Sequence, residues 1–241
     1  MRLFVVGVAL AMIAVPVAAS APSPIDQTEV SIGQFAEFAE ETGLITEAEK
    51  SGGKVFEAGW VQKPGWNWRT PYGVAASADE PAVHITFDEA QSYCVWRGKR
   101  LPTRDEWIRY AYTELRDDPP EPFKTGTTYR YPTGAAPFGA NCLDDCGGAK
   151  GNPPSKTDQS HRLMRGYGHA EVGTTIAGVN GLYDMGANVW EWAVIGDGPQ
   201  QATMGGSWWY GKTQMSADYG ATKPRHMAAI YIGFRCIGFQ P

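Results

Sequence analysis

The sequence is organised around GLYDMGANVWEW, residues 181–192. Asp184 and Glu191 are hard oxygen donors, and the small residues between them let the backbone bend so that main-chain carbonyls become available. Calcium binds about six to eight such oxygens. On composition alone, a simpler interpretation is favoured: an aromatic core strand with a solvated Asp and a solvated Glu. If the end of the stretch is extended, Glu191 shares a face with Val189 and the two tryptophans lie on the opposite face.

The first residues read as an export signal. Arg2 is followed by an apolar run over residues 3–17 and by small residues at 18–21. This order is typical of a secretory signal peptide, and the run is short for a membrane span. We expect a signal peptide over 1–21 and one mature domain over 22–241, periplasmic or secreted, with no membrane span after cleavage. An uncleaved anchor is the alternative.

Charge and composition narrow the class of partner. The chain has 21 basic and 26 acidic side chains, a formal net charge of −5, and no basic stripe. Nucleic acid is therefore not an expected partner. The 29 glycines imply many turns, and the 9 tryptophans supply core area to a fold poor in regular structure.

Three helices are predicted by one local signal, a Ser or Thr N-cap followed three residues later by Gln or Glu. They begin after Ser31, Thr86 and Thr103, and Gly43 ends the first. Short strands are expected over residues 25–30 and 230–234, and from Met204 onward glycine turns alternate with short strands, the first of them within 205–209.

The four cysteines of an exported chain suggest two disulfides, with three possible connectivities. Cys142 and Cys146 are close enough in sequence to close a small ring. A bond between Cys94 and Cys236 closes a very long ring, which the chain-entropy model values at about 4–5 kcal/mol. We favour these two pairs. A metal clip at Cys142 and Cys146 is the alternative, although no nearby histidine completes a zinc set.

Several motifs resemble one family in the same order. GLYDMGANVWEW is similar to the signature segment of the formylglycine-generating enzymes, also called sulfatase-modifying factors. Residues 81–111, the GGSWW turn at 205–209 and the closing GFRC at 233–236 resemble the same family. The resemblance spans about residues 25–241. It implies an α+β, C-type-lectin-like formylglycine-generating-enzyme fold, with twisted antiparallel strands, few helices and much irregular loop, and it also implies the Cys94–Cys236 pair.

The resemblance changes the interpretation of the central stretch. In that family, the positions matching Asp184 and Glu191 give side-chain ligands to a structural calcium, and those matching Ala187 and Val189 give carbonyls. It therefore favours one bound Ca²⁺. A second calcium of the family would fall at Asn141 and, by counting, at Met164, whose thioether is a poor calcium ligand; we expect that site to be lost.

The chemistry of the family depends on residues that this chain lacks. The resemblance implies oxidation of a cysteine in an exported sulfatase, with molecular oxygen and a copper ion held by two cysteines, because thiolates suit Cu(I). The matching positions are Met215 and Gly220 when counted from Gly205, or Lys212 and Ala217 when counted back from Cys236. Neither count finds a cysteine, so copper is not expected and the catalytic residues stay unassigned. A replacement copper site at Met215 and His226 has no diagnostic spacing.

Two functions remain open. The first is an exported formylglycine-generating-enzyme-like protein that acts on or binds an exported peptide, protein or peptide-derived small molecule by chemistry other than copper-thiolate cysteine oxidation. The alternative is a non-catalytic C-type-lectin-like binding module with an aromatic groove. Aromatic-lined clefts serve either function. The candidate groove residues are Trp68, Arg69, Trp208, Trp209, Tyr210, Met215 and His226.

Overall fold

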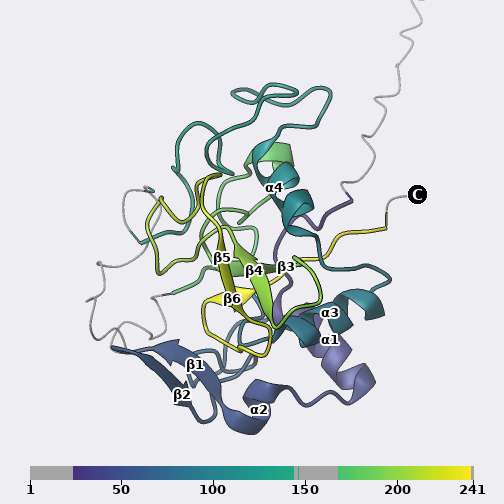
Figure 1. Ribbon diagram of the computed structural model, residues 1–241, viewed down its shortest axis with the longest axis vertical. Coiled ribbons are helices and arrows are strands. Elements are labelled where there is room, and N and C mark those ends of the chain that lie inside the picture. Colours follow the sequence, from purple (N-terminus) through teal and green to yellow (C-terminus); the bar gives the residue numbers. More distant parts are fainter. Residues whose placement is uncertain (1–23, 144–145, 147–167, 240–241) are drawn as a thin grey trace, which may run out of the picture.

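The computed structural model describes residues 24–143, 146 and 168–239. The expected signal peptide and Met164 lie outside these residues. Short helices and strands are joined by long irregular connections, which gives the mixed α+β architecture that the sequence predicts (Figure 1). The elements are α1 (Ile32–Thr42), α2 (Glu47–Ser51), β1 (Gly53–Phe56), β2 (Trp60–Lys63), α3 (Phe87–Trp96), α4 (Arg104–Tyr112), η2 (Val179–Gly181), β3 (Trp190–Ala193), β4 (Gln200–Met204), β5 (Ala221–Pro224) and β6 (Ile232–Gly233).

The three predicted helices are confirmed with their caps. Ser31, Thr86 and Thr103 each form a complete capping box at the start of α1, α3 and α4. Gly43 ends α1 in the left-handed region, with φ of 68°. Helix α2 was not predicted, although Thr46 caps it through the same kind of box. That signal is present in the sequence, but the helix is only one turn long and has no apolar face to mark it.

The main sheet lies at the centre of the molecule, with the order β5-β4-β3-β6 (Figure 1). Strand β3 pairs antiparallel with β4, which places Glu191 opposite Met204, and parallel with β6, which places Trp190 opposite Ile232. One parallel pair therefore joins the expected antiparallel strands. All four residues of β3 are buried, so the central stretch is covered on both faces.

The three predicted short strands need correction. Residues 25–30 form no strand, and Ile25 makes only an isolated bridge to Ile237. Strand β6 is shorter than the expected 230–234. Residues 205–209 form a turn, because Gly205 has a φ of +87° and its backbone passes so close to the Met185 carbonyl oxygen that a β-carbon would lie 2.5 Å from it.

A separate hairpin lies beside the sheet. Strands β1 and β2 pair antiparallel, and the hairpin is tied to the approach to β6 by two main-chain hydrogen bonds. The Lys54 N–H donates to the Ala228 carbonyl at 2.8 Å, and the Ile230 N–H donates to the Lys54 carbonyl at 3.0 Å. The outer strand β2 is largely exposed.

Both predicted disulfides are confirmed. Cys94 of α3 is bonded to Cys236, just after β6, and Cys142 is bonded to Cys146. The first bond fastens α3 to the end of the chain inside the main core, where both cysteines are fully buried. Among the described residues, no helix has the length and apolar character needed to cross a membrane.

Candidate functional site

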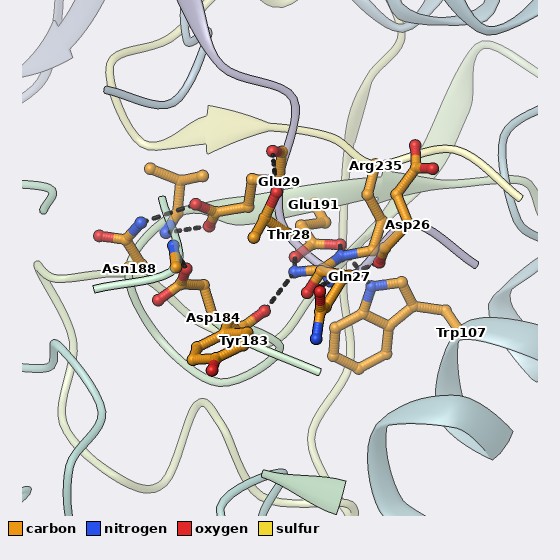
Figure 2. A network of polar contacts seen from close by, with 12 residues as sticks. Asp26, Gln27, Thr28, Glu29, Trp107, Tyr183, Asp184, Asn188, Glu191 and Arg235 are labelled. Atoms are coloured by element: carbon orange, nitrogen blue, oxygen red, sulfur yellow. Dashed lines mark hydrogen bonds and ion pairs between the residues drawn. The ribbon is translucent and has the colours of Figure 1, made fainter. Parts of the chain in front are cut away.

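A buried ion pair lies at the centre of the site that residues 181–192 help to form (Figure 2). Glu191 lies on β3 and Arg235 follows β6, and their side chains are 1% and 0% exposed. The guanidinium donates from Nη2 to Oε1 at 2.7 Å and from Nε to Oε2 at 2.8 Å. The indole N–H of Trp107, from α4, donates to the same Oε2 at 2.8 Å. The pair is therefore bidentate and fully desolvated, the strong form of such a contact.

Arg235 also donates to main-chain carbonyls in two other parts of the chain. Its remaining N–H groups reach the segment before α1 and the stretch before β3 (Figure 2). The acceptors are the carbonyl oxygens of Asp26 at 3.0 Å, Gln27 at 3.2 Å and Tyr183 at 2.7 Å. The guanidinium thus joins the beginning of the described chain, the central stretch and the final segment.

A second set of hydrogen bonds, centred on Asn188 and Glu29, lies within the same site. The Asn188 side chain donates to Glu29 Oε2 at 2.6 Å, and the Val189 N–H donates to Glu29 Oε1 at 3.2 Å. The Asn188 carbonyl oxygen of the side chain accepts from Asn141 at 3.0 Å and from the Ala170 N–H at 2.8 Å. Asn188 has a φ of 48°, an uncommon conformation for a residue other than glycine, and these three hydrogen bonds of its side chain hold it there.

Asp184 is buried separately from Glu191. It too has a positive φ, of 59°. Its carboxylate accepts from the Gly173 N–H at 2.7 Å and from the Thr175 hydroxyl at 2.6 Å. Asp184 is 4% exposed and Glu191 is 1% exposed, so the interpretation in which these two side chains are solvated is wrong.

The buried carboxylates of Glu29, Asp184 and Glu191 surround one buried cation, Arg235, and this imbalance of charge shifts the pKa values of the cluster. Burial raises the pKa of Glu29 well above its ordinary value, and the charges of Asp184 and Glu191 raise it further. Burial also raises the pKa of Asp184, against the opposing effect of its hydrogen bonds to Thr175 and Gly173. Burial alone would lower the pKa of Arg235, but the surrounding carboxylates, Glu191 first, outweigh it and raise that pKa. The environment therefore favours the protonated forms of Glu29 and Asp184.

The side chains of the predicted calcium ligands face different partners in this arrangement. Asp184 is turned toward residues 173–175, whereas Glu191 is turned toward Arg235 and Trp107. An ion bound to Glu191 would compete with the guanidinium for the same two oxygens. Calcium binding at Asp184, Ala187, Val189 and Glu191 stays a prediction.

The candidate groove residues divide into separate groups. Trp208 and Trp209 pack edge to face with ring centroids 5.0 Å apart, and both contact Tyr231, at 5.7 and 5.4 Å. Tyr210 packs instead on Trp190 of β3, at 5.5 Å. These three predicted residues lie together, but only Tyr210 is partly exposed.

The remaining candidates lie elsewhere. Trp68 is fully buried against Phe35 of α1, and its indole N–H donates to Glu49 at 3.1 Å. Arg69 is half-exposed and lies over the Trp68 ring, 4.0 Å from its centroid. His226 is exposed, between β5 and β6. The structure therefore leaves Arg69, Tyr210 and His226 as the candidates that a ligand can reach.

Met215 lies beside the second disulfide. Its side chain is fully buried, and its sulfur is 3.7 Å from the sulfur of Cys146. All four cysteines of the chain are in disulfides. Neither pair of positions matching the copper ligands of the family supplies a thiolate.

Three residues of the buried cluster were not singled out from the sequence as functional: Glu29, Asn188 and Arg235. Glu29 lies in a segment without periodicity, and its partner Asn188 is 159 positions away. Arg235 is visible within GFRC, a motif recognised by resemblance, but nothing in the sequence assigns it to Glu191. The cluster contains three buried carboxylates and one buried guanidinium, and this imbalance of charge becomes visible only when the fold brings the four side chains together.

Together, the fold and this cluster define a C-type-lectin-like α+β domain whose two ends are fastened to a tryptophan-rich central strand. The family model described as a sulfatase-modifying factor enzyme 1-like domain matches residues 16–238. The chain therefore belongs to the sulfatase-modifying factor family.

Individual relatives agree with this assignment. The chain is similar to a formylglycine-generating enzyme of Thermomonospora curvata, with 32% identity over 226 residues, which cover 84% of this chain and 63% of that protein. It is also similar to the inactive C-alpha-formylglycine-generating enzyme 2 of Mus musculus, with 28% identity over 246 residues, 89% of this chain and 74% of that protein. The chain spans less than two thirds of the bacterial relative.

A solved structure supports the same fold. The structure of PvdO from Pseudomonas aeruginosa superposes with a TM-score of 0.59 at 16% identity, covering 88% of this chain and 78% of that one. At this identity the likeness concerns the fold, and it confirms the predicted formylglycine-generating-enzyme type of architecture.

Proposed function

We propose that this protein acts on or binds an exported peptide, protein or peptide-derived small molecule by chemistry other than copper-thiolate oxidation of cysteine. The observation that carries the proposal is the use of the cysteines. All four are bonded in two disulfides, and no cysteine lies between Gly205 and the closing GFRC. A soft thiolate pair for Cu(I) is therefore missing from the chain itself.

Export is part of this proposal. The apolar N-terminal run supports it, and so do the two disulfides, because such bonds persist in oxidising compartments such as the periplasm or the cell exterior. The names of the relatives support a peptide substrate, since formylglycine is generated from a residue of a polypeptide. A structural calcium, held at Asp184 and Glu191 with the carbonyls of Ala187 and Val189, remains a further expectation of the family resemblance.

The second candidate function is binding without catalysis. It is favoured by the absence of the cysteine pair, and a relative whose name describes it as inactive supports the idea that the fold persists without that activity. In both functions we assign first contact with the ligand to Arg69, Tyr210 and His226, the exposed or partly exposed members of the candidate set.

The experiment separates the two functions and tests both. The disulfide-intact protein is incubated in air with peptides from periplasmic proteins and with a cysteine-containing sulfatase peptide, each with and without copper. We expect no formylglycine from the sulfatase peptide in either condition. A protein-dependent mass change in the periplasmic pool supports modification, whereas enrichment of an unmodified peptide supports binding.

Two arginines make a matched pair of variants. Arg69 and Arg97 each follow a tryptophan and lie over its ring, at 4.0 and 5.7 Å, but only Arg69 belongs to the candidate set. Arg69→Ala should weaken capture of the peptide, and Arg97→Ala should leave it unchanged. Robust formylglycine formation, or equal loss in both variants, would contradict the proposal.

A further inference from the structure

A tyrosine, a histidine and a glutamate form a buried chain of hydrogen bonds away from the Arg235 cluster. The Tyr72 hydroxyl lies 3.1 Å from Nδ1 of His169, and Nε2 of His169 lies 2.8 Å from Oε2 of Glu80. The side chains of His169 and Glu80 are 0% and 4% exposed, and Tyr72 is 6% exposed. With Glu80 ionised, Nε2 carries the ring hydrogen and Nδ1 accepts from the phenol.

The backbone fixes this arrangement from both ends. The second oxygen of Glu80 accepts from the Ser77 N–H at 2.9 Å. The Tyr72 oxygen accepts from the main-chain N–H of His169 at 3.0 Å. Gly168 makes the contact possible, because a β-carbon at that position would overlap the Tyr72 hydroxyl. The phenol therefore faces a base on one side and a fixed donor on the other.

An unbroken series of aromatic rings leads from Tyr72 to the surface. The Tyr72 ring is 6.5 Å from Trp208, which is 5.7 Å from Tyr231, which is 6.2 Å from Trp60, all measured between centroids. Trp60, on the outer strand β2, is 44% exposed. Each step is short enough for an electron to pass from ring to ring.

The environment of the Trp208 indole favours transfer of the electron hole from Trp208 to Tyr72. Its indole N–H is buried and has no hydrogen-bond acceptor within the described part of the chain. An oxidised tryptophan there has no base to receive its proton. Tyr72 does have such a base, so the oxidised state is trapped at the phenol, where loss of the electron and of the proton can occur together.

We propose that Tyr72 is a one-electron redox site, with His169 as its proton acceptor and Glu80 as the group that positions His169. In the oxidation step, the electron leaves the Tyr72 phenol through Trp208, Tyr231 and Trp60 to an outer-sphere one-electron oxidant. The O–H bond breaks and its proton moves to Nδ1 of His169. The products are a neutral Tyr72 phenoxyl radical and an imidazolium paired with Glu80. Reduction returns the electron by the same route and the proton to the phenol.

Tyr112 shows why this environment is specific. It is equally buried, but its hydroxyl donates to the Met215 carbonyl at 3.2 Å. A carbonyl oxygen is too weak a base to take up the proton. Tyr112 therefore makes a matched control, a buried tyrosine with an acceptor of the wrong kind.

Flash oxidation of the intact protein tests the proposal. Photogenerated ruthenium(III) tris-bipyridine serves as the oxidant, and tyrosyl formation is followed by transient absorption and high-field EPR. We expect a long-lived neutral tyrosyl signal that is lost in Tyr72→Phe and unchanged in Tyr112→Phe. His169→Gln keeps hydrogen-bonding capacity without the base and should slow tyrosyl formation by about 10²-fold or more. Trp66 is partly exposed and its ring is 6.2 Å from that of Tyr72, so slower formation is expected when Trp60 and Trp66 are both replaced by leucine.

Two outcomes would overturn the proposal. One is an undiminished signal in Tyr72→Phe, and the other is an unchanged rate in His169→Gln. If a variant does not fold, as judged by near-ultraviolet circular dichroism, the wild type carrying ¹⁵N-labelled histidine decides the matter. A radical at Tyr72 must show coupling to a histidine nitrogen, and its absence sinks the assignment. The proposed peptide function does not depend on this site, and the peptide assay tests it separately.

Discussion

Removing the charge of Arg235 should be the most damaging single substitution in the chain. Arg235→Met keeps much of the side-chain volume but leaves Glu191 buried without its partner. It also leaves the carbonyls of Asp26, Gln27 and Tyr183 without their donors. Breaking a buried ion pair from one side typically costs about 3–5 kcal/mol. For a domain of this size, that corresponds to a fall in Tm of roughly 6–20 °C.

The effect should depend on pH with a defined sign. The cation opposes the raised pKa of Glu29 and of Asp184, so its removal raises both pKa values further. A carboxyl group whose pKa is higher in the folded state contributes stability that is present at low pH and lost as pH rises through the folded-state value. The deficit of Arg235→Met should therefore be smallest near pH 4–5 and grow toward pH 8, with the ordinary carboxyl range near 4 as the lower limit.

The assay is urea unfolding of the oxidised protein across this pH range, with two further variants. Trp107→Phe removes the hydrogen bond to Glu191, which should cost about 1.5–3 kcal/mol, and it also removes part of a fully buried ring, which adds a cavity cost. Lys63→Met breaks a partly exposed pair with Glu57, 2.7 Å long, and should cost about 1 kcal/mol. If Arg235→Met is no worse than Lys63→Met, or if its deficit shrinks as pH rises, the reasoning about the buried cluster is wrong.

Three other predictions concern the calcium, a helix cap and the disulfides. A thermal melt of metal-stripped protein with and without millimolar calcium should show that calcium stabilises the fold, by about 2.7 kcal/mol at 100 times the dissociation constant. This stabilisation should be weakened in Asp184→Asn and abolished in Glu191→Ala. No response of the wild type to calcium would reject the site. Hydrogen bonding to Arg100 lowers the pKa of Glu106 to about 2. The wild type should therefore be more stable than Glu106→Gln by about 1 kcal/mol, after allowance for solvent exposure, at pH values above the ordinary pKa of 4.5, and this difference should vanish as pH falls toward 2. A stability difference that is independent of pH would contradict this. Replacing Cys94 and Cys236 by alanine should cost about 5 kcal/mol on the chain-entropy model, against about 2 kcal/mol for Cys142 and Cys146, and urea unfolding that shows equal costs would count against that ranking.

The features predicted correctly from the sequence are those encoded locally or by a family motif. A Ser or Thr cap with its Gln or Glu three residues on acts within one turn, so Ser31, Thr86 and Thr103 could be recognised without knowledge of the fold. The disulfides followed from cysteine arithmetic and from the resemblance. The expected strand at 25–30 failed because that segment serves as a row of acceptors for Arg235 and gains little from sheet pairing.

The arrangement of the buried charges could not be predicted in the same way. The partners of Glu191 come from 84 positions before it and 44 positions after it. No periodicity links such distant residues, and a Glu within an aromatic strand reads equally as a metal ligand or as a solvated side chain. The role of Glu191 depends on which cation the fold places beside it in the core, and in this structure that cation is the guanidinium of Arg235.

The charge balance of the cluster shows how the ion pair and the expected calcium are related. Glu29, Asp184 and Glu191 are all buried, and one guanidinium offsets only one of them. Desolvation makes the remaining charge costly, and burial accordingly raises the pKa of Glu29 and of Asp184, which favours bound protons on these two groups. A calcium ion bound by Asp184 would offset the same charge and would have to displace those protons. Calcium affinity should therefore rise with pH, with proton release on binding, whereas a cluster neutralised by protons alone should lose stability as pH rises whether or not calcium is present.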